Sequence, residues 1–557
     1  MKNSTNFFRS AVARTVAAVL LTAAVCVVPA DAATTPATPL NQSFNLAHQG
    51  TSTIDSLDTT DPMFHQLEKK LYPGPAGGLT ANSLTWTGFL RQGGRVVTVN
   101  LGQKETLTQV SMQFYQNTQQ SILFPSSVRV DISMNGYSWH QAGIMHSSYT
   151  PFANGKLYDT YVQNINNVQA QYVRLAFPVD VWVLARNLRI NGSPWISPSL
   201  TQLPYDSNFN NYAGFLQNSS PAAAGVHNML LVYSGAYGAE GTWTTKQFQP
   251  MVSFMSPSGQ VEGRMFDSFL FLPYGSLLGT EGGWSHYLQN LFAPGQQLAA
   301  LNQTVAQAAP KLNSFGLQAN TANVVLAIPY PNSRVTNWGS IPGTNQSLTF
   351  SSANVGTYQA YNNRVAAMYW YVHALMNAWK RANFTHLKLV GLYWDAEQVD
   401  YAIPNEAKLV QQASTLTHSY GLKLFWIPLY DASGITSWQQ LGFDSVIVQS
   451  NYFETPSLPI SRVTTAADSA LRFGMGMEVE VGPQVLTSAA EQTRYYNQLV
   501  ADFLAGSEGN VVHAYYDASQ VFTQLAYSTN PALRSLYQDT YDFLLGQFTQ
   551  RNFQPAP

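Results

Sequence analysis

Between about residue 45 and residue 193, apolar and polar residues alternate in short segments that turn-forming residues separate. The alternation is clearest in RVVTVNLG (95–102), LTQVSMQFY (107–115), SSVRVDISMNG (126–136), QYVRLAFPV (171–179) and VWVLARNLRING (181–192). A period of two places successive side chains on opposite faces of a strand. Half-buried strands of this kind cover each other's apolar faces, so the pattern predicts an all-β sandwich.

Beyond residue 226 the pattern changes, because short apolar runs begin to alternate with helical stretches. The runs are NMLLVY (228–233), SFLFL (268–272), VVLAIP (324–329), HLKLVGLYW (386–394), LKLFWIPL (422–429), SVIVQ (445–449), MGMEVEV (475–481) and VVHAYY (511–516). The helical stretches are clearest over 363–384, 404–421, 488–506 and 530–548. Eight such alternations predict an α/β TIM (β/α)8 barrel over residues 226–549. A doubly wound sheet is the alternative, although that fold has no reason to use eight units.

The first 32 residues have the features of a secretory signal peptide. Lys2, Arg9 and Arg14 supply the positive end, and the apolar run VAAVLLTAAVCVV follows. Ala30-Asp31-Ala32 provides the small-x-small cleavage pattern. We therefore expect a secreted, extracellular protein.

Two segments of linker-like composition complete the predicted domain organisation. Residues 33–44, rich in Thr, Pro and Ala, are expected to be a disordered linker. Residues 194–225 are expected to join the sandwich, residues 45–193, to the barrel. No second stretch of about 20 apolar residues occurs, so the sequence predicts no membrane span.

The composition favours a neutral polar ligand. Charged residues make up 10% of the chain and aromatic residues 13%, whereas charged residues are about 25% of a typical soluble protein. The formal net charge is −2, and no basic patch indicates nucleic acid as a partner. Cys26, the single cysteine, lies inside the signal segment, so the mature chain has no disulfide or thiolate metal site. Carbohydrate is the partner that we expect.

Carboxylates at the ends of two apolar runs carry the candidate chemistry. Asp395 and Glu397 follow the fourth run, and Glu478 and Glu480 occupy alternate positions of the seventh. Strands four and seven lie across a barrel mouth from one another, and glycoside hydrolysis requires an acid and a second carboxylate there. By analogy with barrel glycosidases, Glu397 is the predicted acid/base and Glu480 its partner, with Glu478 as the alternative partner. Asp395 is a fourth candidate, which could tune their pKa values through like-charge repulsion.

Aromatic and amide residues follow the other runs, where they could stack on sugar rings or bond hydroxyl groups. The predicted substrate contacts are Tyr330, Asn332, Trp394, Tyr430, Asn451, Tyr452, Tyr516 and Asp517. Purely structural interpretations stay open for several residues. Asp395 could cap a loop, Glu478 could pair with a buried Arg or Lys, and Trp394 could be core. Asp431 and Glu454 are expected to be loop charges or substrate contacts rather than catalysts.

The N-terminal region resembles the discoidin family, also called coagulation-factor type C, which implies a galactose-binding-like jelly roll. VTVNLG, VRVDISMNGYSWHQAG (128–143), AQYVRLAF (170–177) and the closing LRING carry the resemblance. Ligand loops in this family lie at one end of the sandwich and vary greatly, so the resemblance identifies no sugar-contacting residue. Trp139 and Trp182 are either exposed stacking platforms or core aromatics. Nothing in the sequence demonstrates a structural calcium ion in the sandwich.

The C-terminal region resembles the secreted bacterial family called domain of unknown function 4855. FDSFLFL (266–272), LAIPYP (326–331), GLYWDAE (391–397), LFWIPLYDASG (424–434), LGFDSVIVQSNYFE (441–454) and GMGMEVE (474–480) carry this resemblance. The family pattern has an acidic residue matching Glu397 and a Glu-x-Glu matching Glu478 and Glu480. Ala396 stands where that pattern has Asn, which puts a side-chain amide there in doubt.

Other chemistries have little support in the sequence. No HExxH motif or clustered His and Asp set indicates a catalytic metal, and no Gly-rich phosphate loop indicates a nucleotide cofactor. The first hypothesis is therefore a secreted glycoside hydrolase with a carbohydrate-binding module and no cofactor. A non-catalytic glycan-binding protein is the second, and a cell-surface structural protein is the third.

Overall fold

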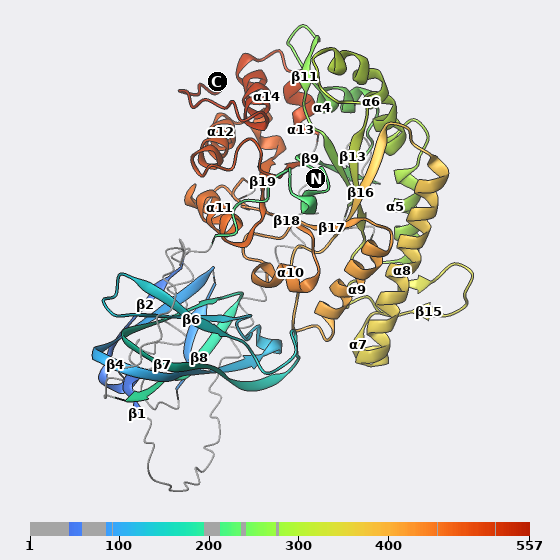
Figure 1. Ribbon diagram of the computed structural model, residues 1–557. Helices are drawn as coiled ribbons and strands as arrows, with labels where there is room; N and C mark the ends of the chain where they lie inside the picture. The colour runs from blue at the N-terminus through green and yellow to red at the C-terminus, as the bar shows by residue number, and fades with distance from the viewer. Residues whose placement is uncertain are drawn as a thin grey trace.

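The computed structural model of this chain describes residues 44–57, 79, 85–91, 93–193, 212–235, 241–274, 278–453, 455–518 and 520–556 (Figure 1). The described residues form an N-terminal antiparallel sandwich and a C-terminal barrel of parallel strands. The predicted signal peptide, the linker 33–44 except its last residue, and Glu454 lie outside the described residues.

Eight antiparallel strands form the sandwich in the part of the chain that the structure describes. They are β1 (Phe44–Asn45), β2 (Thr51–Ser56), β3 (Thr87–Leu90), β4 (Gly94–Asn117), β5 (Val128–Ser133), β6 (Trp139–Met145), β7 (Lys156–Pro178) and β8 (Trp182–Ser193). Their order is β1-β8-β4-β7-β5-β6, with β2 also pairing with β4 and β3 with β8. All five predicted runs are strands, which confirms the predicted sandwich.

The two longest strands, β4 and β7, differ from the prediction. The runs 95–102 and 107–115 form one continuous strand, because β4 stays paired with β7 on both sides of a register shift between Asn100 and Glu105. An irregularity of this kind bends a strand and increases its twist. Val97 and Val99 before the shift and Met112 and Phe114 after it are buried in one apolar cluster, so a single core joins the two parts of the sandwich.

The barrel closes through eight parallel strands. They are β9 (Asn228–Ser234), β12 (Ser268–Pro273), β13 (Ala322–Ile328), β16 (Leu387–Trp394), β17 (Lys423–Trp426), β18 (Ser445–Val448), β19 (Gly476–Val481) and β20 (His513–Asp517). Each overlaps one of the eight predicted runs. The first strand, β9, pairs with both β12 and β20, so the sheet has no edge and is not the doubly wound alternative.

Helices cover the outside of the barrel. The α-helices are α4 (Thr245–Val252), α5 (Glu281–Leu291), α6 (Gln297–Ser314), α7 (Ser352–Val355), α8 (Thr357–Ala382), α9 (Glu406–Ser419), α10 (Trp438–Leu441), α11 (Ser461–Phe473), α12 (Ala489–Leu504), α13 (Val521–Ala526) and α14 (Pro531–Leu544). Two minor hairpins pair β10 (Ser253–Met255) with β11 (Val261–Arg264) and β14 (Gly339–Ser340) with β15 (Ser347–Leu348). Short 3₁₀ turns are η1 (Leu46–Gln49), η2 (Thr118–Gln120), η3 (Pro221–Ala223), η5 (Ile435–Ser437) and η6 (Pro483–Leu486).

Capping residues set the starts of two predicted helices. The Ser488 side chain accepts a hydrogen bond from the Glu491 N–H at the start of α12. Asn530 caps α14 in the same way through the Ala532 N–H, and Pro531 follows it. Proline suits this first helical position, because its missing N–H would have no partner there. Both starts agree with the sequence prediction.

The sandwich lies against the side of the barrel that carries the short helix after β17. This helix, α10, has only four residues, and Figure 1 shows the sandwich next to it. Leu90, Ile122 and Trp182 of the sandwich belong to the same buried apolar cluster as the barrel core. Polar contacts surround this apolar junction. Asp180 accepts a hydrogen bond of 2.8 Å from the Gly434 N–H, and Arg91 forms an ion pair with Asp431 at 2.9 Å.

The two tryptophans for which the sequence left two interpretations are both buried. Trp182 is 7% exposed and Trp139 is 9% exposed. Trp182 lies in the junction with the barrel, and Trp139 packs under the guanidinium of Arg174, 4.1 Å from its ring centroid. Neither is an exposed stacking platform.

The part of the predicted linker that the structure describes packs along the barrel. The Gly214 N–H bonds the Leu471 carbonyl, the Leu216 N–H bonds the Met475 carbonyl, and Gln217 forms a β-bridge with Val511. Residues 212–225 thus pass beside the starts of β19 and β20. In the described part of the chain, no helix has the length and apolar character needed to cross a membrane.

Candidate active site

The four candidate carboxylates lie at the carboxyl ends of the barrel strands. Asp395 and Glu397 directly follow β16, while Glu478 and Glu480 lie on β19 and pair in register with Ala514 and Tyr516 of β20. Alternate residues of a strand share a face, so the two β19 glutamates point the same way at different depths. Both are almost completely buried, with 3% of Glu478 and 2% of Glu480 exposed.

Both carboxylate oxygens of Glu480 accept backbone hydrogen bonds from the segment after β18. The Asn451 N–H donates to Oε1 at 2.7 Å, and the Phe453 N–H donates to Oε2 at 3.1 Å. An ionised carboxylate makes such bonds best. Glu480 therefore fixes the path of the chain that leaves β18, in addition to any chemistry.

A chain of side-chain hydrogen bonds connects Glu397 to the same segment. Gln449 donates to Glu397 Oε1 at 2.9 Å, and Asn451 donates from Nδ2 to Gln449 Oε1 at 2.7 Å. Asn451 also accepts from the Tyr430 N–H at 2.8 Å, and its φ of 50° lies in the left-handed region. Asparagine tolerates this conformation better than most residues. Since Asn451 also donates to Glu480, one connected network holds the ends of β16, β17, β18 and β19.

The charges of Asp395, Glu397 and Glu478 all act on one tyrosine, Tyr393. Burial raises the pKa of Tyr393 well above its usual value, and the charges of Asp395, Glu397 and Glu478 raise it further. Burial also raises the pKa of Tyr233 well above its usual value, and Tyr516, Glu397 and Glu478 raise it further. The carboxylates at the ends of strands four and seven thus act on the same side chains.

The surroundings of Asp395 favour the protonated form of its carboxyl group. Part of the residue reaches the surface, yet burial raises the pKa of its carboxyl well above the usual value, and the neighbouring charge of Glu397 raises it further. Burial disfavours the charged form, and so does a like charge nearby. Asp395 and Glu397 are therefore a coupled acidic pair.

Tyr516 is a predicted substrate contact that lies near this group. Its ring packs edge-on against Tyr233, with 5.9 Å between the centroids, and Tyr274 packs on Tyr233 at 5.3 Å. Tyr516 is partly exposed, so an aromatic surface adjoins the carboxylates.

Three predicted contacts serve instead to hold the loop after β13: Tyr330 and Asn332 belong to this loop, and Trp394, the last residue of β16, packs against it. The Tyr330 hydroxyl donates to Glu406 at 2.7 Å, and Trp394 is fully buried against the Tyr330 ring at 5.7 Å. Arg364 forms an ion pair with Glu406 at 2.7 Å. Asn332 accepts from the Arg334 N–H in a local turn. These contacts hold the loop in place.

The remaining predicted contacts also have structural partners. Arg462 stacks on Tyr430 with 3.8 Å to the ring centroid, and Arg494 stacks on Tyr452 at 3.5 Å. Asp517 accepts hydrogen bonds from the backbone N–H groups of Val521 and Phe522 at the start of α13. Burial nevertheless raises the pKa of Asp517 to about 7.

Sequence reasoning missed Tyr233, Tyr393, Arg364 and Glu406. A usable signal existed for the tyrosines: Tyr233 is the last residue of the first apolar run, and Tyr393 stands two positions before Asp395 on the same strand face. No local pattern connects Arg364 to Glu406, which lies 42 residues further along the chain. Within the described residues, no group of three His, Cys, Asp or Glu side chains could hold a metal ion.

A comparison with protein-family models matches residues 228–542 to "Domain of unknown function (DUF4855)", which is more than half of the chain. The chain belongs to the DUF4855 family. This match covers every strand of the barrel and all four candidate carboxylates of this DUF4855 protein. No curated protein matches it.

The N-terminal region of this DUF4855 protein resembles carbohydrate-binding modules of known structure. One is chitosan-binding module 1 of a chitosanase/glucanase from Paenibacillus sp. IK-5, with 16% identity, coverage of 27% of this chain and 100% of that chain, and a TM-score of 0.20. Another is CBM32-3 of a family 31 glycoside hydrolase from Clostridium perfringens, with 14% identity, 27% and 95% coverage, and a TM-score of 0.21. A GH29 fucosidase from Ruminococcus gnavus has 11% identity, and the match spans 27% of each chain with a TM-score of 0.20. Similarity at this level transfers no ligand or activity.

Proposed function

We propose that the barrel is a glycoside hydrolase that acts on a polysaccharide or glycoconjugate. The observation that carries the proposal is that Asp395, Glu397 and Glu478 lie at the carboxyl ends of β16 and β19 and that their charges all raise the pKa of Tyr393. Glycosidic cleavage needs one carboxylic acid to protonate the leaving oxygen and a second carboxylate to attack or to activate water. A carboxylate group of this kind has little use in a protein that only holds a neutral sugar.

In this proposal Glu397 is the acid/base, and a glutamate of β19 is its partner. Glu478 fits the partner role better than Glu480, because Tyr233 and Tyr393 respond to the charges of both Glu397 and Glu478. Both oxygens of Glu480 already accept backbone N–H groups, which suits a residue that positions the segment after β18. Burial and the charge of Glu397 raise the pKa of Asp395, so in this proposal Asp395 is the neighbouring carboxyl that exchanges a proton with Glu397.

The test is incubation of the purified full chain with a panel of bacterial and plant polysaccharides, with new reducing ends as the readout. Glu397→Gln and Glu478→Gln each keep the side-chain shape and remove the proton chemistry. Each should lower turnover on a cleaved polymer about 10²-fold or more. Glu480→Gln keeps only one oxygen for two N–H donors, so it should also lower thermal stability.

The results separate this proposal from its alternatives. Full activity in both Glu397→Gln and Glu478→Gln would make these residues structural. A larger loss in Glu480→Gln than in Glu478→Gln, with unchanged stability, would move the partner role to Glu480. If the wild type binds a polymer at the barrel and cuts none of the panel, the protein is a non-catalytic glycan-binding protein.

We also propose that the protein is exported and that the sandwich binds glycan. Export rests on the basic start, the apolar run and the cleavage pattern of residues 1–32. Mass spectrometry of protein from the culture medium should find an N-terminus near Ala33. An intact Met1 terminus on that protein would contradict export by cleavage at this site.

A further inference from the structure

Three aromatic side chains gather on one face of the sandwich. The ring centroids of Trp86 and Tyr115 are 5.7 Å apart, those of Trp86 and Tyr158 are 6.1 Å apart, and those of Tyr115 and Tyr158 are 5.0 Å apart. Tyr115 and Tyr158 are direct partners on the neighbouring strands β4 and β7. Phe114, which precedes Tyr115 on β4, is fully buried in the core. Successive side chains of a strand point to opposite faces, so Tyr115 points to the outer face. We call Trp86, Tyr115 and Tyr158 the aromatic platform.

The platform combines exposure with rigid support. Tyr158 is 44% exposed, and Trp86 and Tyr115 are partly exposed. The two partly exposed rings also pack against the apolar core that the sandwich shares with the barrel, which fixes their positions. Aromatic rings that are held in place and open to solvent bind flat apolar faces at little cost in conformational entropy. The face of a pyranose ring, lined with C–H groups, is a surface of this kind.

Polar groups border the platform where ring hydroxyls would lie. The guanidinium of Arg186 lies 4.3 Å from the Trp86 ring centroid. It donates to Gln113 at 2.6 Å, and Asn187 donates to the same oxygen at 3.4 Å. The guanidinium and amide groups place hydrogen-bond donors beside the rings, and the hydroxyl oxygens of a sugar are acceptors for such groups.

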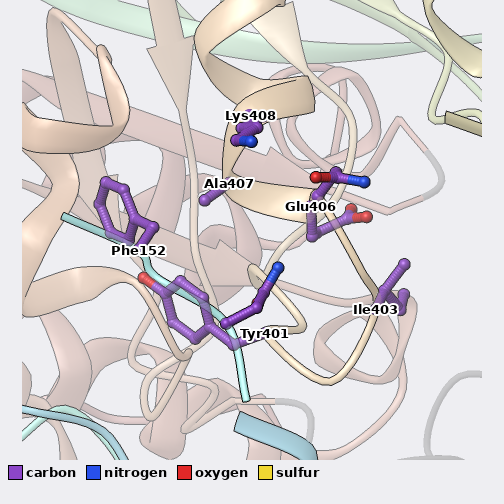
Figure 2. A pocket seen from close by; sticks show the side chains of 8 residues that line it. Phe152, Tyr401, Ile403, Glu406, Ala407 and Lys408 are labelled. Carbon is purple, nitrogen blue, oxygen red and sulfur yellow. The ribbon is translucent and has the colours of Figure 1, made fainter. Parts of the chain in front are cut away.

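The platform connects to the barrel through the loop between β6 and β7. In this loop Phe152 stacks on Tyr401 with 5.9 Å between centroids and 12° between ring planes. Ala153 accepts a hydrogen bond from Gln116, which neighbours Tyr115 on β4. Figure 2 shows Phe152 and Tyr401 beside one pocket, which Glu406 and Lys408 also line.

The position of Tyr401 relates the platform to the candidate active site. Tyr401 lies in the segment between β16 and α9, four residues after Glu397. The loop that adjoins the platform therefore contacts the same βα segment that carries Asp395 and Glu397. A ligand long enough to cover several sugar units can contact both regions.

We propose that the aromatic platform is the glycan-binding site of the sandwich, and that it takes an internal stretch of a polysaccharide chain that continues toward the barrel mouth. The proposal rests on the proposed function. It identifies a site on a sheet face rather than in the end loops, and it commits the substrate to a polymer. A terminal sugar bound by an end loop would not need a surface of three neighbouring rings.

The test is affinity electrophoresis of the full chain with Glu397→Gln in the background, so that no cleavage occurs during the run. Separate gels contain hydroxyethyl cellulose, laminarin, glycol chitosan or polygalacturonate. At least one polymer should retard the protein, and Tyr158→Ala and Trp86→Ala should each weaken its apparent affinity about tenfold. The control is Tyr137→Ala, because Tyr137 is 87% exposed, lies in the turn between β5 and β6, and is not one of the platform residues. It should bind like the parent.

Several results would overturn this proposal. One is retardation by none of the four polymers, and another is full affinity in Tyr158→Ala. A loss confined to Tyr137→Ala would place the site in the end loops. Thermal unfolding separates binding from packing, since Tyr158→Ala should unfold within about 2 °C of its parent. The gels measure binding and the reducing-end assay measures hydrolysis. A negative result in one assay therefore does not decide the other.

Discussion

At the scale of single residues, Asp517 shows how a carboxylate at a strand end can serve the fold. It ends β20, and one of its oxygens accepts the N–H groups at the start of α13. Its other oxygen is buried without a hydrogen-bond partner among the described residues. A buried carboxylate oxygen without a donor favours the protonated form.

Asp517 should therefore make stability depend on pH. Its pKa is about 7 in the folded chain and about 3.9 in the unfolded chain, so the folded state holds the extra proton between these values. The contribution of Asp517 to the free energy of unfolding is fully present below about pH 4 and is lost as the pH rises to about 7. Asp517→Asn keeps an acceptor for Val521 and cannot ionise. It should be roughly 1–3 kcal/mol more stable than the wild type at pH 8 and equal to it at pH 4.

Urea unfolding at several pH values measures this effect. Asp55→Asn, which changes an exposed carboxyl on β2, is the control and should leave the profile unchanged. A wild-type and an Asp517→Asn profile that run parallel from pH 4 to pH 8 would show that Asp517 stays ionised.

The residue scale also shows which parts of the site a sequence can predict. Asp395, Glu397, Glu478 and Glu480 are predictable, because each is a charge at the end of an apolar run in a chain with few charges. The donors to Glu480 are not predictable, because they are backbone groups of Asn451 and Phe453. Any residue carries such an N–H, so only the path of the chain determines the contact.

At the scale of elements, the segment after β18 depends on the conformation of one residue. Asn451 combines a φ of 50° with hydrogen bonds to the Tyr430 N–H and to Gln449. A side chain with a Cβ is strained at such a φ, and glycine is not. Replacing Asn451 thus separates a backbone effect from a side-chain effect.

Asn451→Gly removes the two side-chain hydrogen bonds and keeps the backbone relaxed. Asn451→Ala removes the same bonds and adds backbone strain, so it should be about 1 kcal/mol less stable than Asn451→Gly. Both should lower turnover, because Gln449 loses the partner that holds it toward Glu397. Urea titration gives the first comparison and the reducing-end assay the second. Equal stabilities would mean that the segment relaxes to another path.

The elements themselves followed closely from the sequence. The eight barrel strands were predictable because strands buried on both faces are continuous apolar runs, and β12 and β19 are buried at every position. The continuity of β4 was not, because its register shift falls in the polar stretch between two alternating runs. The sequence also does not predict that α10 is only four residues long, because this length matters through the sandwich that packs beside the helix.

At the scale of the whole molecule, junction residues of the sandwich are buried in the apolar cluster of the barrel, while the rest of the sandwich has a core of its own. Trp182 of β8 is buried in the apolar cluster that extends into the barrel, whereas Trp139 of β6 packs on Arg174 within the sandwich. Trp182→Ala should therefore lower the unfolding temperature of the barrel as well as that of the sandwich, at a cost of about 3–5 kcal/mol. Trp139→Ala is the matched control, and its effect should be confined to the sandwich.

Scanning calorimetry, together with trypsin digestion that reports which domain has unfolded, distinguishes the two variants. We expect one cooperative transition for the wild type, because neither domain can separate without exposing the junction around Trp182. Two independent transitions, with the barrel transition unmoved in Trp182→Ala, would show that the junction adds nothing to barrel stability.

The short α10 has a consequence for inheritance. A module on a flexible tether can be exchanged by recombination, because its neighbour keeps a complete surface of its own. Here the barrel leaves a flank beside α10 that Leu90, Ile122 and Trp182 complete. A gene fusion that carried the barrel without the sandwich would expose the apolar residues around Trp182 to solvent, so we expect the two domains to be inherited together.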